Sequence, residues 1–188
     1  MRAMSLLFSN NLCSAYVAEV VKSFQTLKPS GYLGRTALQK FVYFSKAVGV
    51  PVPCSFEIYN FGPYSEEVTR SVSALLADEA LQDVSSTSKY SSYKAGMNST
   101  EFSSEYTNEA AHFRTLIDSI VGVLGDCKAE TLELVATLHF VNAKLKGIFG
   151  MRPAQESVVQ EFKLIKGEKF SDAEIQVWYG WLAESNLL

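Results

Sequence analysis

The residues able to carry chemistry are few in this chain and lie far apart. It has two histidines, His112 and His139, and neither has a cysteine or a carboxylate at the spacing of a zinc site. Both fall in segments with helical periodicity, and His139 lies between Leu138 and Phe140, which is typical of a hydrogen-bonded core histidine. We therefore predict no metal and no cofactor.

Two pairs of charged residues have spacings that occur in metal-dependent enzymes. Glu161 and Lys163 match the Glu-x-Lys spacing of some nucleases, but the residues around them have helical periodicity, which places both on a solvated face. Glu130 and Glu133 are one helical turn apart, without the partner carboxylates or Glu-x-x-His pairs of a di-metal site, so we interpret them as surface charges. A metal-dependent nuclease is the least favoured function.

The cysteines and glycines also argue against an enzyme. Cys13, Cys54 and Cys127 are odd in number and lie in apolar segments, which is typical of reduced core cysteines in a cytoplasmic protein. Cys127 has no neighbouring base that would make it a nucleophile. Gly31 and Gly34 give neither a phosphate loop nor a dinucleotide fingerprint. We predict a protein that binds without catalysis.

The composition is that of a globular protein. The 188 residues are 47% hydrophobic and 20% charged, which suits one domain or two small lobes that share a core. The formal net charge of −3 gives no overall attraction to nucleic acid, so DNA binding would need a local basic patch. Residues 1–8 are too short an apolar run for a signal peptide or a membrane span, and no membrane partner is expected.

Apolar spacing and turn residues predict the elements of the first half. Two helices and one strand are expected over 13–27, 35–48 and 54–61, with the strand ending at Gly62-Pro63. Ser65 should cap a third helix that reaches about Glu79, and two strands over 81–84 and 90–95 should form a hairpin. This order approximates a winged helix with the third helix in the recognition position, although Glu66 and Glu67 at its start do not favour DNA.

The second half should be entirely helical. Apolar stripes predict helices over 113–124, 128–146 and 158–165, the first of them preceded by Asn108 as a cap. Ser171 and Glu174 have the spacing of a capping box for a last helix. The fold class is therefore mainly α (α+β), a helical bundle with winged-helix-like units and a small β-hairpin. A polar link suggests lobes over 1–98 and 99–188 with one shared core.

Two stretches resemble a known family. The segments GRTALQKFVYF (34–44) and FEIYNFGPYSE (56–66) resemble the uncharacterised bacterial YwgA-like family and, more distantly, the Panacea or SocA-like antitoxin domain. Residues 132–140 and the segment that begins at Lys169 are similar to that group too. The resemblance implies a mostly helical fold without established catalytic residues. In the antitoxin branch it implies neutralisation of a toxin by direct contact or its delivery to a protease, and Tyr64 departs from that branch, which more often has an apolar residue there.

The family motif also defines the candidate site. Arg35, Gln39 and Tyr43 recur one turn apart on a helix face, which is either exposed as an interface or turned inward to brace the Gly62-Pro63 turn. The predicted partner-binding residues are Arg35, Gln39, Lys40, Tyr43, Tyr59, Gly62, Pro63, Tyr64 and Glu66. A toxin or defence component is the expected partner, and self-association stays open. The alternative is a DNA-binding regulator, whose nucleic-acid face would use Arg35, Lys40, Lys89, Lys94, Tyr90 and Tyr93.

Overall fold

The described residues form two units that interleave along the chain. The computed structural model describes residues 11–85, 90–99 and 105–188. One unit runs to Glu57 and resumes over Tyr64–Cys127, and the second joins Ile58–Pro63 to Lys128–Leu188. Residues 105–127, expected in the second lobe, therefore pack within the first unit, and the six residues 58–63 lie with the second.

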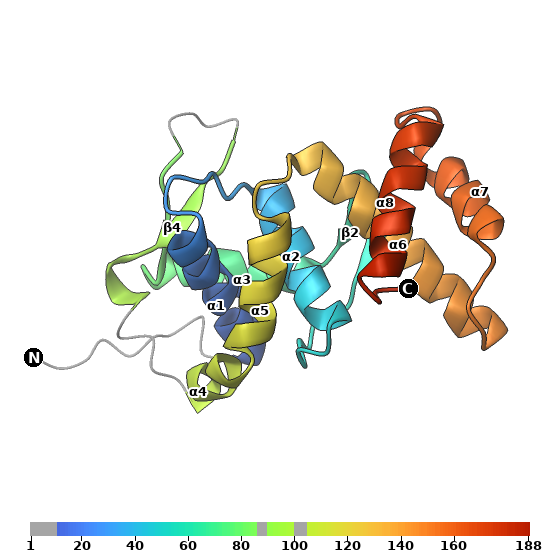
Figure 1. Cartoon of the computed structure of the whole chain (residues 1–188). Coiled ribbons are helices and arrows are strands. Elements are labelled where there is room, and N and C mark those ends of the chain that lie inside the picture. Colours follow the sequence, from blue (N-terminus) through green and yellow to red (C-terminus); the bar gives the residue numbers. More distant parts are fainter. Residues whose placement is uncertain (1–10, 86–89, 100–104) are drawn as a thin grey trace, which may run out of the picture. The chain divides into compact units, whose positions relative to one another are not determined.

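Helix α1 is the centre of the first unit. The helices of this unit are α1 (Leu12–Leu27), α2 (Arg35–Ala47), α3 (Glu66–Ala77), α4 (Glu105–His112) and α5 (Arg114–Leu124). Figure 1 shows α1 and α5 side by side, and α1 also contacts α2, α3 and α4. Between α1 and α5, the buried carboxylate of Glu19 accepts a hydrogen bond from Arg114 at 2.5 Å, and Arg114 also binds Asp118 at 2.7 Å. The expected cap Asn108 lies inside α4, so that prediction was wrong.

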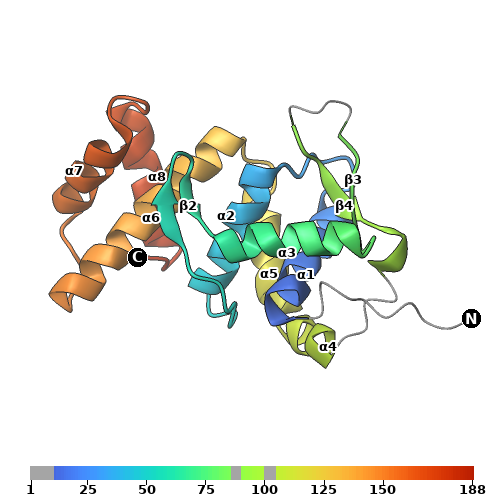
Figure 2. The same ribbon diagram turned by 180° about the vertical axis from the view of Figure 1, so that it is seen from behind.

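A β-hairpin follows α3, as expected. Strands β3 (Leu81–Asp83) and β4 (Tyr93–Ala95) are antiparallel, and Leu81 lies opposite Ala95. Figure 2 shows the hairpin beside the end of α3. The short 3-10 helix η1 (Met97–Ser99) follows it. Lys89, a residue of the alternative DNA-binding face, lies outside the described residues.

The segment before α3 differs from the expected single strand. Residues Glu57–Tyr59 form β1, and Gly62–Tyr64 form β2, which pairs with it. Gly62 does not end a strand but supplies the positive φ of 84° that the turn requires, and a ribbon of two strands tolerates a proline without an N–H at its edge. Ser65 caps α3 as predicted, because its side chain accepts a hydrogen bond from the backbone N–H of Val68.

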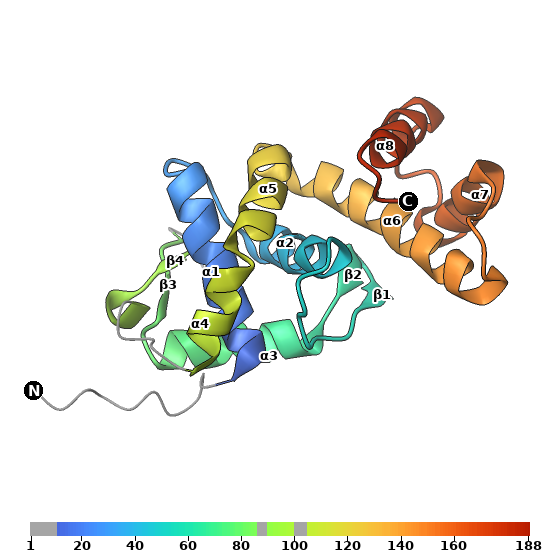
Figure 3. The same cartoon turned by 60° about the horizontal axis from the view of Figure 1, so that its bottom comes forward.

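The second unit is built around one long helix. Figure 3 shows α7 (Gln155–Lys166) and α8 (Asp172–Glu184) packed against α6 (Ala129–Phe149). The predicted central position of α6 is confirmed, because every residue from Leu132 to His139 is buried. The capping box is present too: Ser171 accepts from the N–H of Glu174, and the Glu174 carboxylate accepts from the N–H of Ser171. The mainly helical fold with a small hairpin is therefore confirmed.

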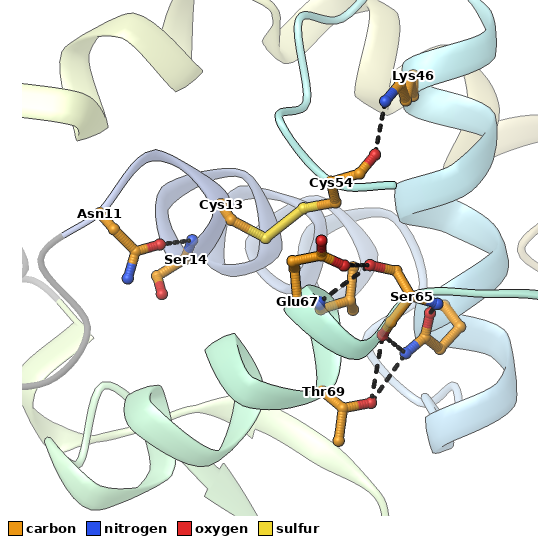
Figure 4. The surroundings of a disulfide bond; sticks show 10 residues. Asn11, Cys13, Ser14, Lys46, Cys54, Ser65, Glu67 and Thr69 are labelled. Carbon is orange, nitrogen blue, oxygen red and sulfur yellow. Dashed lines mark hydrogen bonds between the residues drawn. A yellow bond between two sulfur atoms is a disulfide. The ribbon is translucent and has the colours of Figure 1, made fainter. Parts of the chain in front are cut away.

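Two of the cysteines are joined. Cys13 in the first turn of α1 and Cys54 in the segment after α2 form a disulfide with a Cα–Cα distance of 6.5 Å, as Figure 4 shows. The prediction that all three thiols are reduced is thereby corrected. Chain spacing gave no sign of it, because the packing of α1 against α2 brings together residues that are 41 positions apart. Cys127 is a free thiol.

No helix in the described part of the chain combines the length and the apolar character that a membrane span requires.

Candidate partner-binding site

Gln39 decides between the two orientations of the predicted face. Its side chain is buried, with 3% exposure, and its amide nitrogen donates to the backbone carbonyl of Ser65 at 2.9 Å. Its amide oxygen accepts from the backbone N–H of Ser65 at 3.0 Å. Gln39 therefore acts as a brace that ties α2 to the cap of α3, and it is not an exposed interface residue.

The neighbouring predicted residues on α2 are also internal. Lys40 is 2% exposed and Tyr43 is 7% exposed. The Tyr43 ring lies edge-on against Phe56, with 5.2 Å between the ring centroids, and burial raises the pKa of its hydroxyl well above the ordinary value. These two side chains fill the core, so neither offers a contact surface to a partner. Arg35, one turn before Gln39, is exposed.

The other predicted residues divide between the two units. Gly62 and Pro63 are buried in the second unit, and Tyr59 of the same unit is 65% exposed. In the first unit Tyr64 is half-buried, and its hydroxyl accepts a hydrogen bond from the Thr69 hydroxyl at 2.8 Å. Glu66 is exposed in the first turn of α3, where a carboxylate favours the positive end of the helix dipole.

A groove in the first unit is lined by Arg35 but not by Tyr64 or Glu66. It has a volume of about 280 Å³ and lies between α2, α3 and the β3–β4 hairpin. We call its apolar lining the floor and its polar lining the rim. The floor consists of Leu38, Val68, Val72, Leu76 and Tyr93, and the rim of Arg35, Thr69, Ser73, Asp83 and Ser91, while buried Gln39 lines the groove from inside. Such an apolar floor with a few convergent polar groups is typical of a binding site.

The rim of this groove carries one charge of each sign. The guanidinium of Arg35 donates to the Ser91 hydroxyl at 3.3 Å. Asp83 accepts from the backbone N–H groups of Ser85 and Ser92, each at 3.0 Å. Burial acts to raise the pKa of Asp83, but these hydrogen bonds outweigh it and the pKa is lowered. Asp83 is thus held as an anion by its own hairpin, whereas Arg35 has five N–H donors and can bind a further acceptor.

The bracing role of Gln39 yields a stability prediction. Gln39→Ala removes both hydrogen bonds to the Ser65 backbone and a third to Thr69 at 3.1 Å, which leaves the buried cap of α3 unsatisfied. We expect a loss of about 2 kcal/mol in the free energy of unfolding. Urea denaturation followed by far-UV circular dichroism measures it, with exposed Gln82→Ala as the control. Equal midpoints for the two variants would contradict the brace.

A second polar cluster was missed by the sequence analysis. Glu133 was interpreted as a surface charge, but it is 2% exposed and binds the ammonium groups of Lys166 and Lys169, each at 2.8 Å. Lys166 also donates to the carbonyl of Asn60 at 3.0 Å, and Lys169 lies over the ring of Phe61. The cluster fixes the β1–β2 turn within the second unit. The sequence did contain a sign of this cluster: Glu133 lies between Leu132 and Leu134 in a helix that was predicted to be buried.

The pair considered for nuclease chemistry is engaged in ion pairs. Glu161 lies 3.9 Å from the ammonium of Lys144, and Lys163 binds Asp172 at 2.5 Å. Glu161 and Lys163 lie on α7, not on a strand. Among the described residues no three His, Cys, Asp or Glu side chains gather as metal ligands would.

Comparison with known proteins gives one relative of unknown activity. No protein-family model matches the chain. The chain is similar to YwgA. This uncharacterized protein of Bacillus subtilis (strain 168) is 24% identical over 151 residues, which cover 77% of this chain and 90% of YwgA. The likeness supports the YwgA-like resemblance that the sequence motifs indicated, and the more distant link to the Panacea domain stays a prediction.

Proposed function

We propose that the chain is a non-catalytic adaptor that binds a partner protein through the groove between α2, α3 and the β3–β4 hairpin. The observation that carries the proposal is this groove of about 280 Å³, which has an apolar floor and exposed Arg35 at its rim. Tyrosine and arginine, present here as Tyr93 and Arg35, are enriched among interface hot spots. The binding surface is therefore smaller than the predicted set of residues, because Gln39, Lys40 and Tyr43 support it from inside.

The groove also indicates the chemistry of the segment it would take. Leu38, Val72 and Leu76 along its floor accept a large apolar side chain. The Arg35 guanidinium at the rim suits a carboxylate, which it can bind with two parallel N–H donors. A partner segment with an acidic residue beside a bulky apolar one fits both features. An antitoxin-like or phage-defence role is the biological setting we propose, on the strength of the family resemblance.

DNA binding has less support from the same unit. The order of α3 and the β3–β4 hairpin favours it, because a winged helix places its recognition helix before the wing. However, Lys40 and Tyr93 of the expected nucleic-acid face are 2% and 5% exposed, so they cannot reach a phosphate backbone. Glu66 and Glu67 add negative charge to the first turn of α3.

Capture of the partner tests the proposal. Full-length tagged protein is purified from its native host with nuclease treatment, beside the variants Arg35→Ala and Arg152→Ala. We expect a stoichiometric protein partner with the wild type and with Arg152→Ala, whose arginine is also exposed but lies in the second unit. Arg35→Ala should recover at least tenfold less, because the loss of a charged interface hydrogen bond costs about 2 kcal/mol or more.

Two results would contradict this function. Equal recovery by Arg35→Ala and the wild type would place the binding surface elsewhere. Recovery of nucleic acid alone, lost as the salt concentration rises, would favour the DNA-binding alternative. Circular dichroism spectra that match the wild type are required of both variants, so that reduced capture is not a consequence of unfolding.

A further inference from the structure

The disulfide lies at the edge of a second depression in the first unit. A shallow hollow of about 560 Å³ is lined by Asn11, the N-cap of α1, by Cys13 of α1 and by Glu67, Arg70 and Ala74 of α3. Cys13 is 8% exposed at this hollow, whereas Cys54 is fully buried. Of the two cysteines, Cys13 is therefore the one that retains some contact with solvent, and Cys54 is the shielded one.

Hydrogen bonds fix both the segment that contains Cys54 and the start of α3. The carbonyl of Cys54 accepts from the ammonium of Lys46 at 2.5 Å, which fixes this part of the segment. The Ser65 hydroxyl donates to the Glu67 carboxylate at 2.8 Å (Figure 4). The pKa of Glu67 is lowered first by this bond, then by its own backbone N–H, and also by the backbone N–H of Ser55, the residue after Cys54. Cys13 and Glu67 line the same hollow, and Glu67 accepts from the cap residue Ser65, so the disulfide lies beside the first turn of α3.

Helix α3 separates the hollow from the partner groove. Glu67, Arg70 and Ala74 face the hollow, and Val68, Thr69 and Val72 face the groove. Because one rigid helix lines both, a shift in its first turn at the hollow also changes the width of the groove. Ser73 contributes to both linings.

We propose that Cys13–Cys54 is a redox-active site for a dithiol reductant, and that its oxidation state controls the position of the first turn of α3 and thus the fit of the partner groove. The control of partner binding rests on the proposed function, but the coupling between disulfide and helix does not. In reducing compartments, disulfides of this kind are usually transient.

The chemistry is an ordinary thiol–disulfide exchange. A thiolate of the reductant attacks the Cys13 sulfur, the Cys13–Cys54 bond breaks, and the Cys54 thiolate leaves and takes up a proton. The second thiol of the reductant, as its thiolate, then attacks the mixed disulfide and releases Cys13, which is protonated in turn. Two electrons and two protons have passed to the protein, and the dithiol has become a disulfide.

Thiol counting establishes the pairing first. The full chain is oxidised with diamide or reduced with dithiothreitol, freed of reagent, denatured and titrated with a chromogenic disulfide. We expect all three cysteines of the sequence to react in the reduced form and Cys127 alone in the oxidised form. Three reactive thiols after diamide treatment would overturn the proposal.

Hydrogen–deuterium exchange of the oxidised and reduced samples then tests the coupling between the disulfide and α3. The control is Cys127→Ser, which lacks the free thiol but keeps the disulfide. Reduction should increase exchange of the Val68 and Thr69 amides at least tenfold and leave α6, α7 and α8 unchanged. Equal exchange at α3 in both forms, or a uniform increase throughout the chain, would overturn the switch. Because no partner is present in this measurement, it can succeed even where partner capture fails.

Partner capture with diamide-oxidised and dithiothreitol-reduced bait completes the test. A difference in recovery of at least fivefold between the two forms is expected. A partner recovered equally by both forms would overturn the control of the groove while leaving the proposed function in place. No partner in either form would count against the proposed function, and the exchange measurement would then decide the redox coupling alone.

Discussion

Replacing Glu133 with alanine should lower the free energy of unfolding of the second unit by about 3 to 5 kcal/mol, the usual cost of removing one partner from a buried ion pair. Glu133 and the side chain of Lys166 are 2% and 4% exposed, so the substitution leaves an ammonium group buried without its counter-charge. Lys169 contributes less, because its side chain is 38% exposed and water screens its charge. The turn that contains Asn60 should loosen as well.

Tryptophan fluorescence during urea denaturation measures this effect directly. The two tryptophans of the sequence, Trp178 and Trp181, both lie on α8 of the second unit, so the signal reports that unit. Glu130→Ala is the matched control, because Glu130 is exposed one turn earlier on the same helix. A loss below 1 kcal/mol for Glu133→Ala, or equal losses for both variants, would show that the cluster does not hold the unit together.

The stability of the second unit should also fall as the pH drops from 6.5 toward 4. His139 is 9% exposed, and burial lowers its pKa from 6.5 to about 4, an effect that the charge of Lys146 increases and a hydrogen bond with the Leu187 backbone opposes. The unfolded chain therefore takes up a proton at pH values where the folded chain does not. Above pH 6.5 the histidine has no such effect, and below about pH 4 the loss is complete, at roughly 3 kcal/mol.

Comparison with His139→Gln separates the contribution of His139 to the pH dependence of stability from that of the carboxylates. Between pH 7 and pH 4.5 the wild type should lose roughly 2 to 3 kcal/mol more than His139→Gln, which cannot be charged at this position. His112→Gln, which replaces the chain's other histidine at an exposed site on α4, should follow the wild type. Parallel pH profiles for the wild type and His139→Gln would mean that the imidazole is solvated in the folded protein.

Most of the helices could be predicted because their signals are local. The helix expected over 35–48 extends from Arg35 to Ala47, and the capping box at Ser171 and Glu174 formed as its spacing indicated. Apolar residues three and four apart and a cap in the neighbouring turn lie within one segment, so no tertiary information is required. The β1–β2 hairpin was missed because Gly62 and Pro63 usually end a strand, whereas here they begin one.

The candidate site could be predicted only in part, because its geometry depends on contacts between distant residues. The helix face that contains Arg35 and Gln39 was identified, but its inward half binds Ser65, 26 residues away, and no spacing rule foretells that contact. Burying a glutamine costs little free energy when its amide group is fully hydrogen-bonded, so the residue type did not show whether Gln39 is exposed or buried. The groove itself requires Tyr93 and Ser91 of the hairpin, which had been assigned to a wing.

The Glu133 cluster and the disulfide were missed for different reasons. A carboxylate between Leu132 and Leu134 in a segment expected to be buried must have a counter-charge, and the lysines near residue 166 were available, so this contact could have been inferred. The disulfide could not, since odd cysteines in apolar segments are as typical of reduced thiols as of a single bond.

The interruption of the first unit by residues 58–63 has a consequence for biosynthesis. Residues 58–63 emerge from the ribosome early. They belong to the same unit as α6, and Lys166 binds their turn at Asn60, but both α6 and Lys166 are synthesised only after α3, α4 and α5. Domains generally fold as they emerge, N-terminal first. The nascent first unit therefore has to fold with an unfinished loop, whose residues Gly62 and Pro63 are buried only once the second unit has been synthesised. A ribosome that stalls before α7 would leave this loop without the Lys166 contact to Asn60 and available to chaperones.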